Sequence, residues 1–328
     1  MSGPDRAQRV LLHGGQVFDG TGSPAAPADV VLQGTHIAQV GTGLDGDRGV
    51  DVTGRTIYPG FFDCHVHLTS SGVDLMQRVT RPFSYQFYEA AQHLAATLAT
   101  GVTTVRDAGG ADLGIQQAVE DGLIQGPRVL LAVNIIGQTG GHTDGWFPSG
   151  LDLPLSTPHP GRPAGIADGP DEMRKVVRQM LRAGANVIKI CTTGGVLSLT
   201  DDPAHTQFNA AEIEVAVAEA RACDVDVMAH AQGTEGIKNA IRAGVRSIEH
   251  GIYLDDEAIS MMLERGTWLV PTLVAPLAVL EAADAGANIP PAVVAKARVV
   301  IEAHTTSVRA AISAGVNIAM GTDSGVGP

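Results

Sequence analysis

The chain has 328 residues, which is enough to bury a large core and exceeds the usual length of a single domain. Hydrophobic residues make up 44% of the chain and charged residues 17%, a composition that excludes disordered and fibrous proteins. The formal net charge is −13, and Lys and Arg form no cluster along the sequence, which argues against a nucleic-acid partner.

The cysteines and the N-terminal residues bear on the cellular compartment. Cys64, Cys191 and Cys223 are odd in number and far apart, which is a poor basis for disulfides and fits a reducing compartment. Residues 1–8 are polar and contain no apolar core of a signal peptide, and no stretch of the sequence is long enough to cross a bilayer. We therefore predict a cytoplasmic protein with no membrane partner.

The first part of the chain consists of short apolar stretches separated by glycine-containing turns. Four stretches are typical of β-strands, at residues 10–12, 16–18, 30–32 and 37–40. We predict that residues 1–56 form a small β module, with an irregular N-terminal arm as the alternative.

From residue 57 onward, short apolar strands alternate with longer helical stretches. The predicted strands comprise residues 57–67, 102–106, 129–133, 187–191, 225–230, 247–250, 267–272 and 317–322. The predicted helices comprise residues 85–100, 171–183, 210–223, 234–243, 255–264 and 292–314. Several of these helices end at a glycine, such as Gly101 or Gly244, which adopts the helix-terminating left-handed conformation at little cost.

Eight strands that alternate with helices favour a parallel sheet, and eight is the number that closes a (β/α)8 TIM-type barrel. We predict an α/β protein in which residues 57–328 form this barrel. A doubly wound open sheet is the alternative, but its first strand would normally lead into a glycine-rich phosphate loop, and here that strand ends in histidines. Residues 134–170 would form a long loop on the catalytic face, for which we expect a lid rather than a disordered segment.

His65 and His67 lie at the end of the first predicted strand. Because side chains alternate along a strand, His-x-His places both imidazoles on one face, where they can bind one divalent metal ion. The motif also arises by chance as a structural or surface pair, so the pair alone does not decide between the two readings.

Lys189 lies within the apolar run of the fourth predicted strand, where burial of an ammonium group is costly. The structural explanation is a salt-bridged core lysine, or one whose ammonium group reaches the mouth of the barrel. The functional explanation is a lysine whose amine is capped by carbon dioxide, so that the resulting carbamate bridges two metal ions.

Three further polar residues close later strands: His230 the fifth, His250 the sixth and Asp323 the eighth. Each alone is explained by a structural role, as a hydrogen-bonded histidine or a helix-capping aspartate. An aspartate in this place can also bind a metal ion and accept the proton of an attacking water molecule. Ligand-type residues at the ends of so many strands, where barrel enzymes place their active sites, favour a common metal centre.

In this order the motifs resemble those of the amidohydrolase superfamily, which carries His-x-His after strand one, Lys after strand four, His after strands five and six, and Asp after strand eight. Within it, the chain looks like the peptidase-like, imidazolonepropionase-like branch, which includes prolidases and Xaa-Arg/Lys dipeptidases. A related branch removes an amide-linked phenylalanine from a mycotoxin. Five stretches carry this closer resemblance: Thr103–Gly110, Thr139–His142, Thr193–Val196, Met228–Gly233 and Ile248–Gly251.

The resemblance implies a binuclear metal-dependent hydrolase that cleaves an amide or peptide bond of a small substrate. The substrate would be a dipeptide or an N-acyl amino acid, and the enzyme would release its C-terminal amino acid. His65, His67 and Asp323 would hold one metal ion. His230 and His250 would hold the other, and zinc is the metal that we expect in both places.

The resemblance also assigns roles to Lys189, His142 and Tyr253, and a second role to Asp323. Carbamylated Lys189 and a hydroxide would bridge the two metal ions, and Asp323 would pass a proton to the leaving amine. His142 in the long loop and Tyr253 after strand six are candidates for binding the substrate's carboxylate or carbonyl. An exposed loop histidine and a packed aromatic ring are the structural alternatives. We also expect a homo-oligomer.

The resemblance covers the whole chain, because the N-terminal strands look like the family's small β-sandwich. The family continues beyond strand eight with a helix and further strands, whereas this sequence stops at Pro328, so we expect a C-terminal part to be missing. Two other functions compete with the binuclear hydrolase. A mononuclear cyclic-amide hydrolase or deaminase of the same fold would lack the bridging lysine, and a non-catalytic scaffold would lack the ligands.

Overall fold

A computed structural model describes residues 8–72, 74–198 and 201–326. The chain divides into two compact units, Met1–Phe61 and Phe62–Pro328. Pro328, where the sequence predicts a missing C-terminal part, lies outside the described residues. Within the described ranges, no helix combines the length and the apolar character needed to span a bilayer, and the three cysteines are free thiols.

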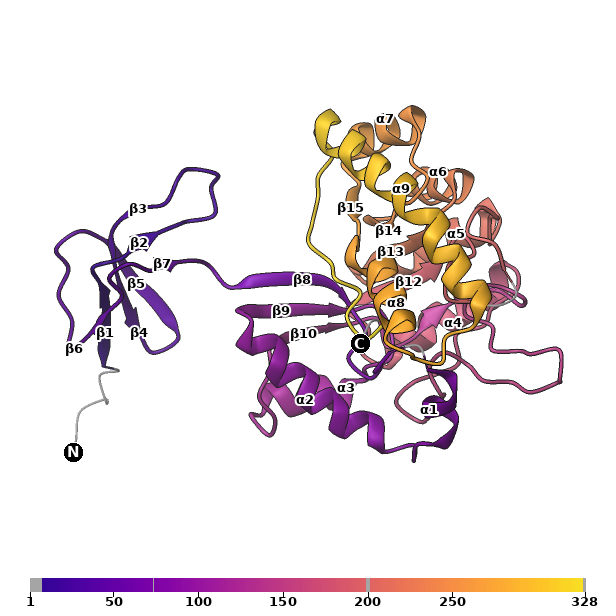
Figure 1. Cartoon of the computed structure of the whole chain (residues 1–328), viewed down its shortest axis with the longest axis horizontal. Coiled ribbons are helices and arrows are strands. Elements are labelled where there is room, and N and C mark those ends of the chain that lie inside the picture. Colours follow the sequence, from indigo (N-terminus) through magenta and orange to yellow (C-terminus); the bar gives the residue numbers. More distant parts are fainter. Residues whose placement is uncertain (1–7, 73, 199–200, 327–328) are drawn as a thin grey trace. The chain divides into compact units, whose positions relative to one another are not determined.

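The smaller unit consists of short strands in two sheets (Figure 1). The strands are β1 (Arg9–His13), β2 (Gln16–Val17), β3 (Ala26–Pro27), β4 (Asp29–Gln33), β5 (His36–Gly41), β6 (Arg48–Asp51) and β7 (Thr56–Ile57). Their order is β5–β4–β1–β6 in one sheet and β3–β2–β7 in the other. The four expected strands are confirmed, and the buried side chains of Val30 and Val31 on β4 give this unit its apolar centre.

The larger unit alternates strands and helices along the chain, as expected (Figure 1). Its strands are β8 (Phe61–Val66), β9 (Val102–Asp107), β10 (Arg128–Leu131), β11 (Ile135–Ile136), β12 (Val187–Cys191), β13 (Asp226–Ala231), β14 (Ser247–His250) and β15 (Trp268–Val270). Its helices are α1 (Leu75–Thr80), α2 (Tyr85–Ala99), α3 (Leu113–Glu120), α4 (Pro170–Arg182), α5 (Ala210–Arg221), α6 (Thr234–Ala243), α7 (Asp256–Arg265), α8 (Val274–Asp284) and α9 (Pro291–Ala314). The sequence did not predict α1, α3 and α8.

The strands of the larger unit form two sheets, with the orders β10–β9–β8 and β11–β12–β13–β14–β15. Neighbouring strands in the second sheet are parallel, as are β9 and β10. Residues 318–324 connect the outer strands of the two sheets, because Ile318 forms a parallel bridge with Leu269 of β15 and Ser324 forms one with Val66 of β8. Hydrogen bonds therefore lead from β15 back to β8, and the carboxyl ends of these strands lie near one another.

The eighth expected strand, residues 317–322, forms these isolated bridges rather than a regular ladder. Gly321 lies so close to β8 that a Cβ atom on it would be 2.9 Å from the Cβ of His65. Asp323 then adopts a positive φ of 59°, which ends the extended backbone. The segment thus brings Asp323 close to His65 at the expense of strand geometry.

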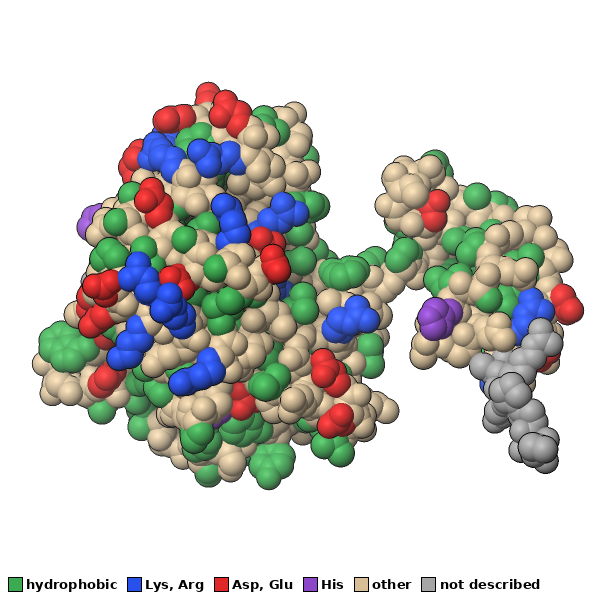
Figure 2. Space-filling view, turned by 180° about the vertical axis from the view of Figure 1, so that it is seen from behind, with side chains coloured by type: hydrophobic (Ala, Val, Ile, Leu, Met, Phe, Trp, Pro, Cys, Tyr) green, Lys and Arg blue, Asp and Glu red, His purple; other side chains and the backbone are tan. Residues whose placement is uncertain are grey.

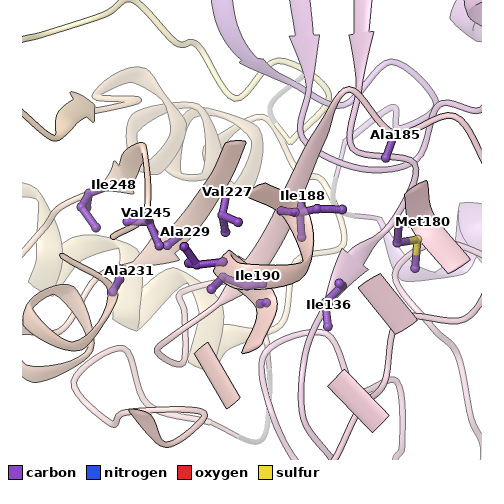
Figure 3. Packing of buried hydrophobic residues seen from close by; sticks show 14 of the residues in the cluster. Ile136, Met180, Ala185, Ile188, Ile190, Val227, Ala229, Ala231, Val245 and Ile248 are labelled. Carbon is purple, nitrogen blue, oxygen red and sulfur yellow. The ribbon is translucent and has the colours of Figure 1, made fainter. Parts of the chain in front are cut away.

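The core of the larger unit lies between the parallel strands and the helices. Figure 3 shows side chains from β12, β13 and β14, such as Ile188, Val227 and Ile248, packed together, and all three are buried. Helix α4 contributes Met173 and Met180, which lie seven residues apart and therefore on the same face of the helix. Apolar residues at this spacing explain why the sequence predicts the helix.

The long loop between β11 and α4 is anchored to the rest of the unit by Arg162. This side chain is buried and donates hydrogen bonds to the main-chain oxygens of Gly110 and Thr157 and to the side chain of Gln86 on α2. A guanidinium group with this many acceptors fixes the loop against two other segments. The loop is therefore ordered where Arg162 holds it.

Acidic and basic side chains lie side by side on the face of the larger unit that Figure 2 shows. Such pairs occur between α4 and α5, where Arg174 and Arg178 both form ion pairs with Glu219. Exposed pairs of this kind contribute little to stability, on the order of 0–1 kcal/mol.

Candidate metal centre

His65, His67 and Asp323 form a compact group of ligand atoms at the carboxyl end of β8. One ligand atom from each lies within 4.8 Å of those of the other two. Oδ1 of Asp323 is 3.5 Å from Nε2 of His65 and 3.3 Å from Nε2 of His67. The alternation of side chains along the extended chain places the two histidines on one side, as the sequence predicts.

Hydrogen bonds orient both imidazoles so that their Nε2 atoms face Asp323. Nδ1 of His65 lies 2.7 Å from the Glu249 carboxylate, and Nδ1 of His67 lies 2.8 Å from the main-chain oxygen of Gly109. These acceptors require the proton on Nδ1 and leave the Nε2 lone pair available. Oδ1 of Asp323 is buried and has no hydrogen-bond partner within the described structure. The group therefore fits a divalent metal ion, which would satisfy all three atoms.

His230 and His250 continue the group along β13 and β14. The ring centroids of His250 and His65 are 5.1 Å apart, and those of His250 and His230 are 4.7 Å apart. Nδ1 of His250 lies 2.7 Å from the Thr272 hydroxyl, and Nε2 of His230 lies 3.0 Å from the main-chain oxygen of Gly194. These two contacts leave Nε2 of His250 and Nδ1 of His230 available as ligand atoms.

Burial keeps the imidazoles of His65, His230 and His250 in their neutral, metal-binding form, whereas at His67 the hydrogen bond to Asp323 and the charge of Asp323 outweigh burial and raise the pKa. Burial lowers the pKa of His65 to about 4, with nearby Lys189 acting in the same direction. Burial also places the pKa values of His230 and His250 well below the usual value. Because His65 is neutral at pH 7, its contact with Glu249 is a hydrogen bond to a carboxylate rather than an ion pair.

The Lys189 side chain is buried in the same place, with only 2% of its surface exposed. Burial lowers the pKa of its amine, which makes the neutral amine more accessible than on an exposed lysine. Only the neutral amine has the lone pair that can react with carbon dioxide. Lys189 is thus chemically suited to the carbamate that the sequence predicts.

The carboxylates nearby stay ionised. Burial alone would raise the pKa of Glu249, but the positive charge of Arg106 and the hydrogen bond from His65 outweigh it and lower this pKa to about 2. Burial also opposes the charge of Asp323, yet the neighbouring His65 and His67 lower its pKa below the usual range. The centre therefore presents negative charge to a cation.

Three residues at strand ends in this region have a left-handed backbone, which is costly for residues other than glycine. The φ values are 72° for His250, 47° for Thr272 and 59° for Asp323. Conformations of this kind cost on the order of 1–3 kcal/mol each and cluster at functional sites. Here they turn the side chains that end β14, β15 and the eighth segment toward one cavity.

That cavity has a volume of about 670 Å³, which lies within the range of small-molecule sites. All six predicted ligands line it: His65, His67, Lys189, His230, His250 and Asp323. One apolar wall comes from α8, α9 and the segment between them, and includes Val279, Ile289 and Val293. The lining also includes the aromatic side chains of Phe83 and Trp146.

His142, from the long loop, lies over this centre, whereas Tyr253 does not. The His142 ring stacks on that of His230 with centroids 4.3 Å apart, and its Nδ1 is 3.3 Å from Asp201 Oδ2. Tyr253 packs against the apolar cluster that includes Ile252 and is absent from the described lining of the cavity.

Four residues that orient the centre were missed from the sequence: Arg106, Asp201, Glu249 and Thr272. A glutamate within an otherwise apolar strand was a usable signal for Glu249, by the same reasoning that singled out Lys189. The other three carry no such local signal.

Comparison with known proteins adds independent information. The model of the amidohydrolase family matches residues 56–327. Ochratoxinase from Aspergillus niger is 34% identical over an alignment of 343 residues, which covers 98% of this chain and 70% of the relative. The crystal structure of a Xaa-Pro dipeptidase with bound methionine is similar at 35% identity and a TM-score of 0.88, covering 98% of this chain and 80% of that one. The crystal structure of a prolidase complexed with N-methylphosphonate-L-proline is similar at 38% identity and a TM-score of 0.87, covering 96% of this chain and 78% of that one.

Proposed function

The chain belongs to the amidohydrolase family and is a hydrolase that acts on C–N bonds, and we propose that it is a binuclear metal-dependent enzyme that cleaves an amide or peptide bond of a small substrate. The observation that carries this proposal is the shared cavity lined by all six ligand-type residues. The substrate would be a dipeptide or an N-acyl amino acid, and the enzyme would release its C-terminal amino acid.

The architecture that we propose is a (β/α)8 barrel over residues 57–328, preceded by a small β-sandwich portion over residues 1–56. The hydrogen-bonded path from β15 through residues 318–324 to β8 supports a closed ring of strands. In such a barrel the carboxyl ends of the strands carry the active site, and the candidate ligands lie at these ends.

We assign the ligands to two sites. The first metal site consists of His65, His67 and Asp323, whose ligand atoms already face one another. The second metal site consists of His230 and His250. Carbamylated Lys189 would lie between the sites: its neutral Nζ would form a bond to the carbon of carbon dioxide, one proton would leave, and the carbamate oxygens would become ligands.

Two divalent metal ions, most consistent with zinc for this set of histidine and carboxylate donors, would activate water and polarise the amide carbonyl when bound. Asp323 would accept the proton of the attacking water at a carboxylate oxygen and deliver it to the nitrogen of the leaving amine. The position of Asp323 in the lining of the cavity, beside the other candidate ligands, supports this role.

The cavity walls support a substrate with an apolar acyl group. Val279, Ile289 and Val293 offer an apolar surface beside the centre, and aromatic side chains such as Trp146 lie on another part of the lining. His142 would bind the carboxylate or carbonyl of the substrate from above His230. A role for Tyr253 stays a prediction, as do the cytoplasmic location and the homo-oligomer.

A substrate screen tests the proposal. The zinc-supplemented protein would be incubated with N-acyl amino acids and dipeptides, and the free C-terminal amino acid would be measured by chromatography. We expect release from at least one substrate with an apolar acyl group, and loss of release after chelation. Release of ammonia without an amino acid would contradict the proposal and indicate a deaminase.

A further inference from the structure

A buried carboxylate beside His65 lies outside both metal sites. Glu249 on β14 is fully buried, and its Oε2 lies 2.7 Å from Nδ1 of His65. Its Oε1 accepts hydrogen bonds from Nη2 of Arg106 at 2.8 Å and from Oγ of Ser247 at 2.5 Å. Both carboxylate oxygens therefore have partners, which fixes the position of the oxygen that faces His65.

Arg106 holds Glu249 in place through contacts of its own. Its Nε donates to the main-chain oxygen of Cys64 at 2.7 Å, and its Nη1 donates to Ser247 Oγ at 3.2 Å. Arg106 belongs to the sheet β10–β9–β8 and Glu249 to the sheet β11–β15, so the network joins the two sheets next to the metal centre. Because several bonds fix the guanidinium group, the carboxylate has little freedom to turn away from His65.

Among the four histidines assigned to the metal sites, His65 differs from the others because its hydrogen-bond partner is charged. Those three are held by neutral groups, namely the Gly109 carbonyl, the Thr272 hydroxyl and the Gly194 carbonyl. A carboxylate forms a stronger hydrogen bond with a ring N–H than a neutral acceptor does. It also increases the basicity of the other ring nitrogen, which is the one that faces the metal site.

We propose that Glu249, fixed by Arg106, is a positioning residue that sets the orientation and the Nδ1–H tautomer of His65. Through His65 it strengthens the first metal site relative to the second. The inference rests on the proposed function, because it assumes that the first metal site binds an ion. A merely structural ion pair would join the two sheets but would leave the affinity for metal unchanged.

The test compares Glu249→Gln with a matched control, Glu212→Gln. Glu212 is also a buried glutamate, but it accepts hydrogen bonds from the main-chain nitrogens of Asn209 and Gly169 and does not line the cavity. Transfer of zinc from the loaded full-length chain to a chromogenic chelator gives the affinity of each ion. In Glu249→Gln we expect one ion to bind about 10- to 100-fold more weakly and the other to change by less than about threefold. The Glu212→Gln protein should bind both ions like the wild type.

Equal zinc affinities in folded Glu249→Gln and in the wild type would overturn the inference. Should the variant fail to fold, nitrogen-15 NMR of the imidazoles in the zinc-stripped wild type decides instead, with the His65 signal assigned by its loss in His65→Gln. Protonation of His65 at Nδ1 supports the inference, and protonation at Nε2 overturns it. A wild type that binds no zinc would contradict the proposed function itself, so the two failures are distinguishable.

Discussion

Replacement of Gly195 by alanine would push the His142 ring out of its position over the metal centre. A Cβ atom on Gly195 would lie 2.6 Å from Nδ1 and 2.7 Å from Nε2 of His142, and closer still to its Cε1. Ordinary contacts begin at 3.4 Å, so relief of the Nδ1 contact alone would require a retreat of about 0.8 Å (3.4 − 2.6), and the closer Cε1 contact requires the ring to retreat further. Gly195 does not have a left-handed backbone, so this steric contact is the main effect of the substitution.

The retreat would disturb two contacts of His142, the stacking on His230 and the approach to Asp201. A misplacement of about 1 Å of a group that positions the substrate can reduce the rate about 100-fold. This corresponds to about 2.7 kcal/mol of transition-state stabilisation. We therefore expect kcat/KM of Gly195→Ala to fall by about two orders of magnitude, with metal content unchanged.

The assay is amino-acid release from the best substrate of the screen, with kcat and KM determined separately and the metal content measured on the same sample. Gly41→Ala in the smaller unit is the matched control, because its Cβ would make an ordinary contact of 3.7 Å with Leu44. Activity of Gly195→Ala within about threefold of the wild type would refute a positioning role for His142. Loss of metal together with activity would show instead that the ring acts through His230.

Three further predictions concern the ligands and the core. Lys189→Ala should lose most of its metal, and short carboxylic acids should restore part of its activity because they can replace the carbamate; wild-type metal content and activity in the variant would contradict the carbamate. Asp323→Asn should lower kcat by about 100- to 10,000-fold, since the amide cannot accept the proton of the attacking water; an unchanged kcat would exclude Asp323 as the base. Ile188→Ala should destabilise the fold by about 2–5 kcal/mol in urea unfolding, because the side chain is fully buried and its removal leaves a cavity; a change below about 1 kcal/mol would mean that the core around β12 collapses to fill the space.

The alternation of strands and helices was predictable because it depends on local sequence patterns, namely apolar runs and helix-terminating glycines. The four-residue strand at Ser247 and the helix that begins at Thr234 have the expected bounds, since apolar runs and a terminal glycine mark them. Helix α8 was missed because its residues are apolar on most sides and show no clear period. Residues 317–322 were expected as a strand because they are apolar, but the approach of Gly321 to β8 and β15 interrupts the ladder.

In the candidate site, the ligand-type residues could be predicted from the sequence, whereas the residues that orient them could not. The residue types at the strand ends follow from the sequence, and the structure brings these side chains to one cavity, although their roles as ligands stay predictions. The partners that orient them do not follow, because Glu249 lies 184 positions from His65 in the sequence. Tyr253 was selected from the resemblance, and its place beside Ile252 depends on packing that no local pattern encodes.

The metal content of the gently purified wild-type chain tests the central claim most directly. Elemental analysis against protein concentration should give about two divalent ions per chain, as a binuclear centre requires. About one ion per chain would contradict the binuclear centre and favour a mononuclear enzyme of the same fold. Absence of bound metal, even after incubation with zinc, would contradict metal-dependent catalysis altogether.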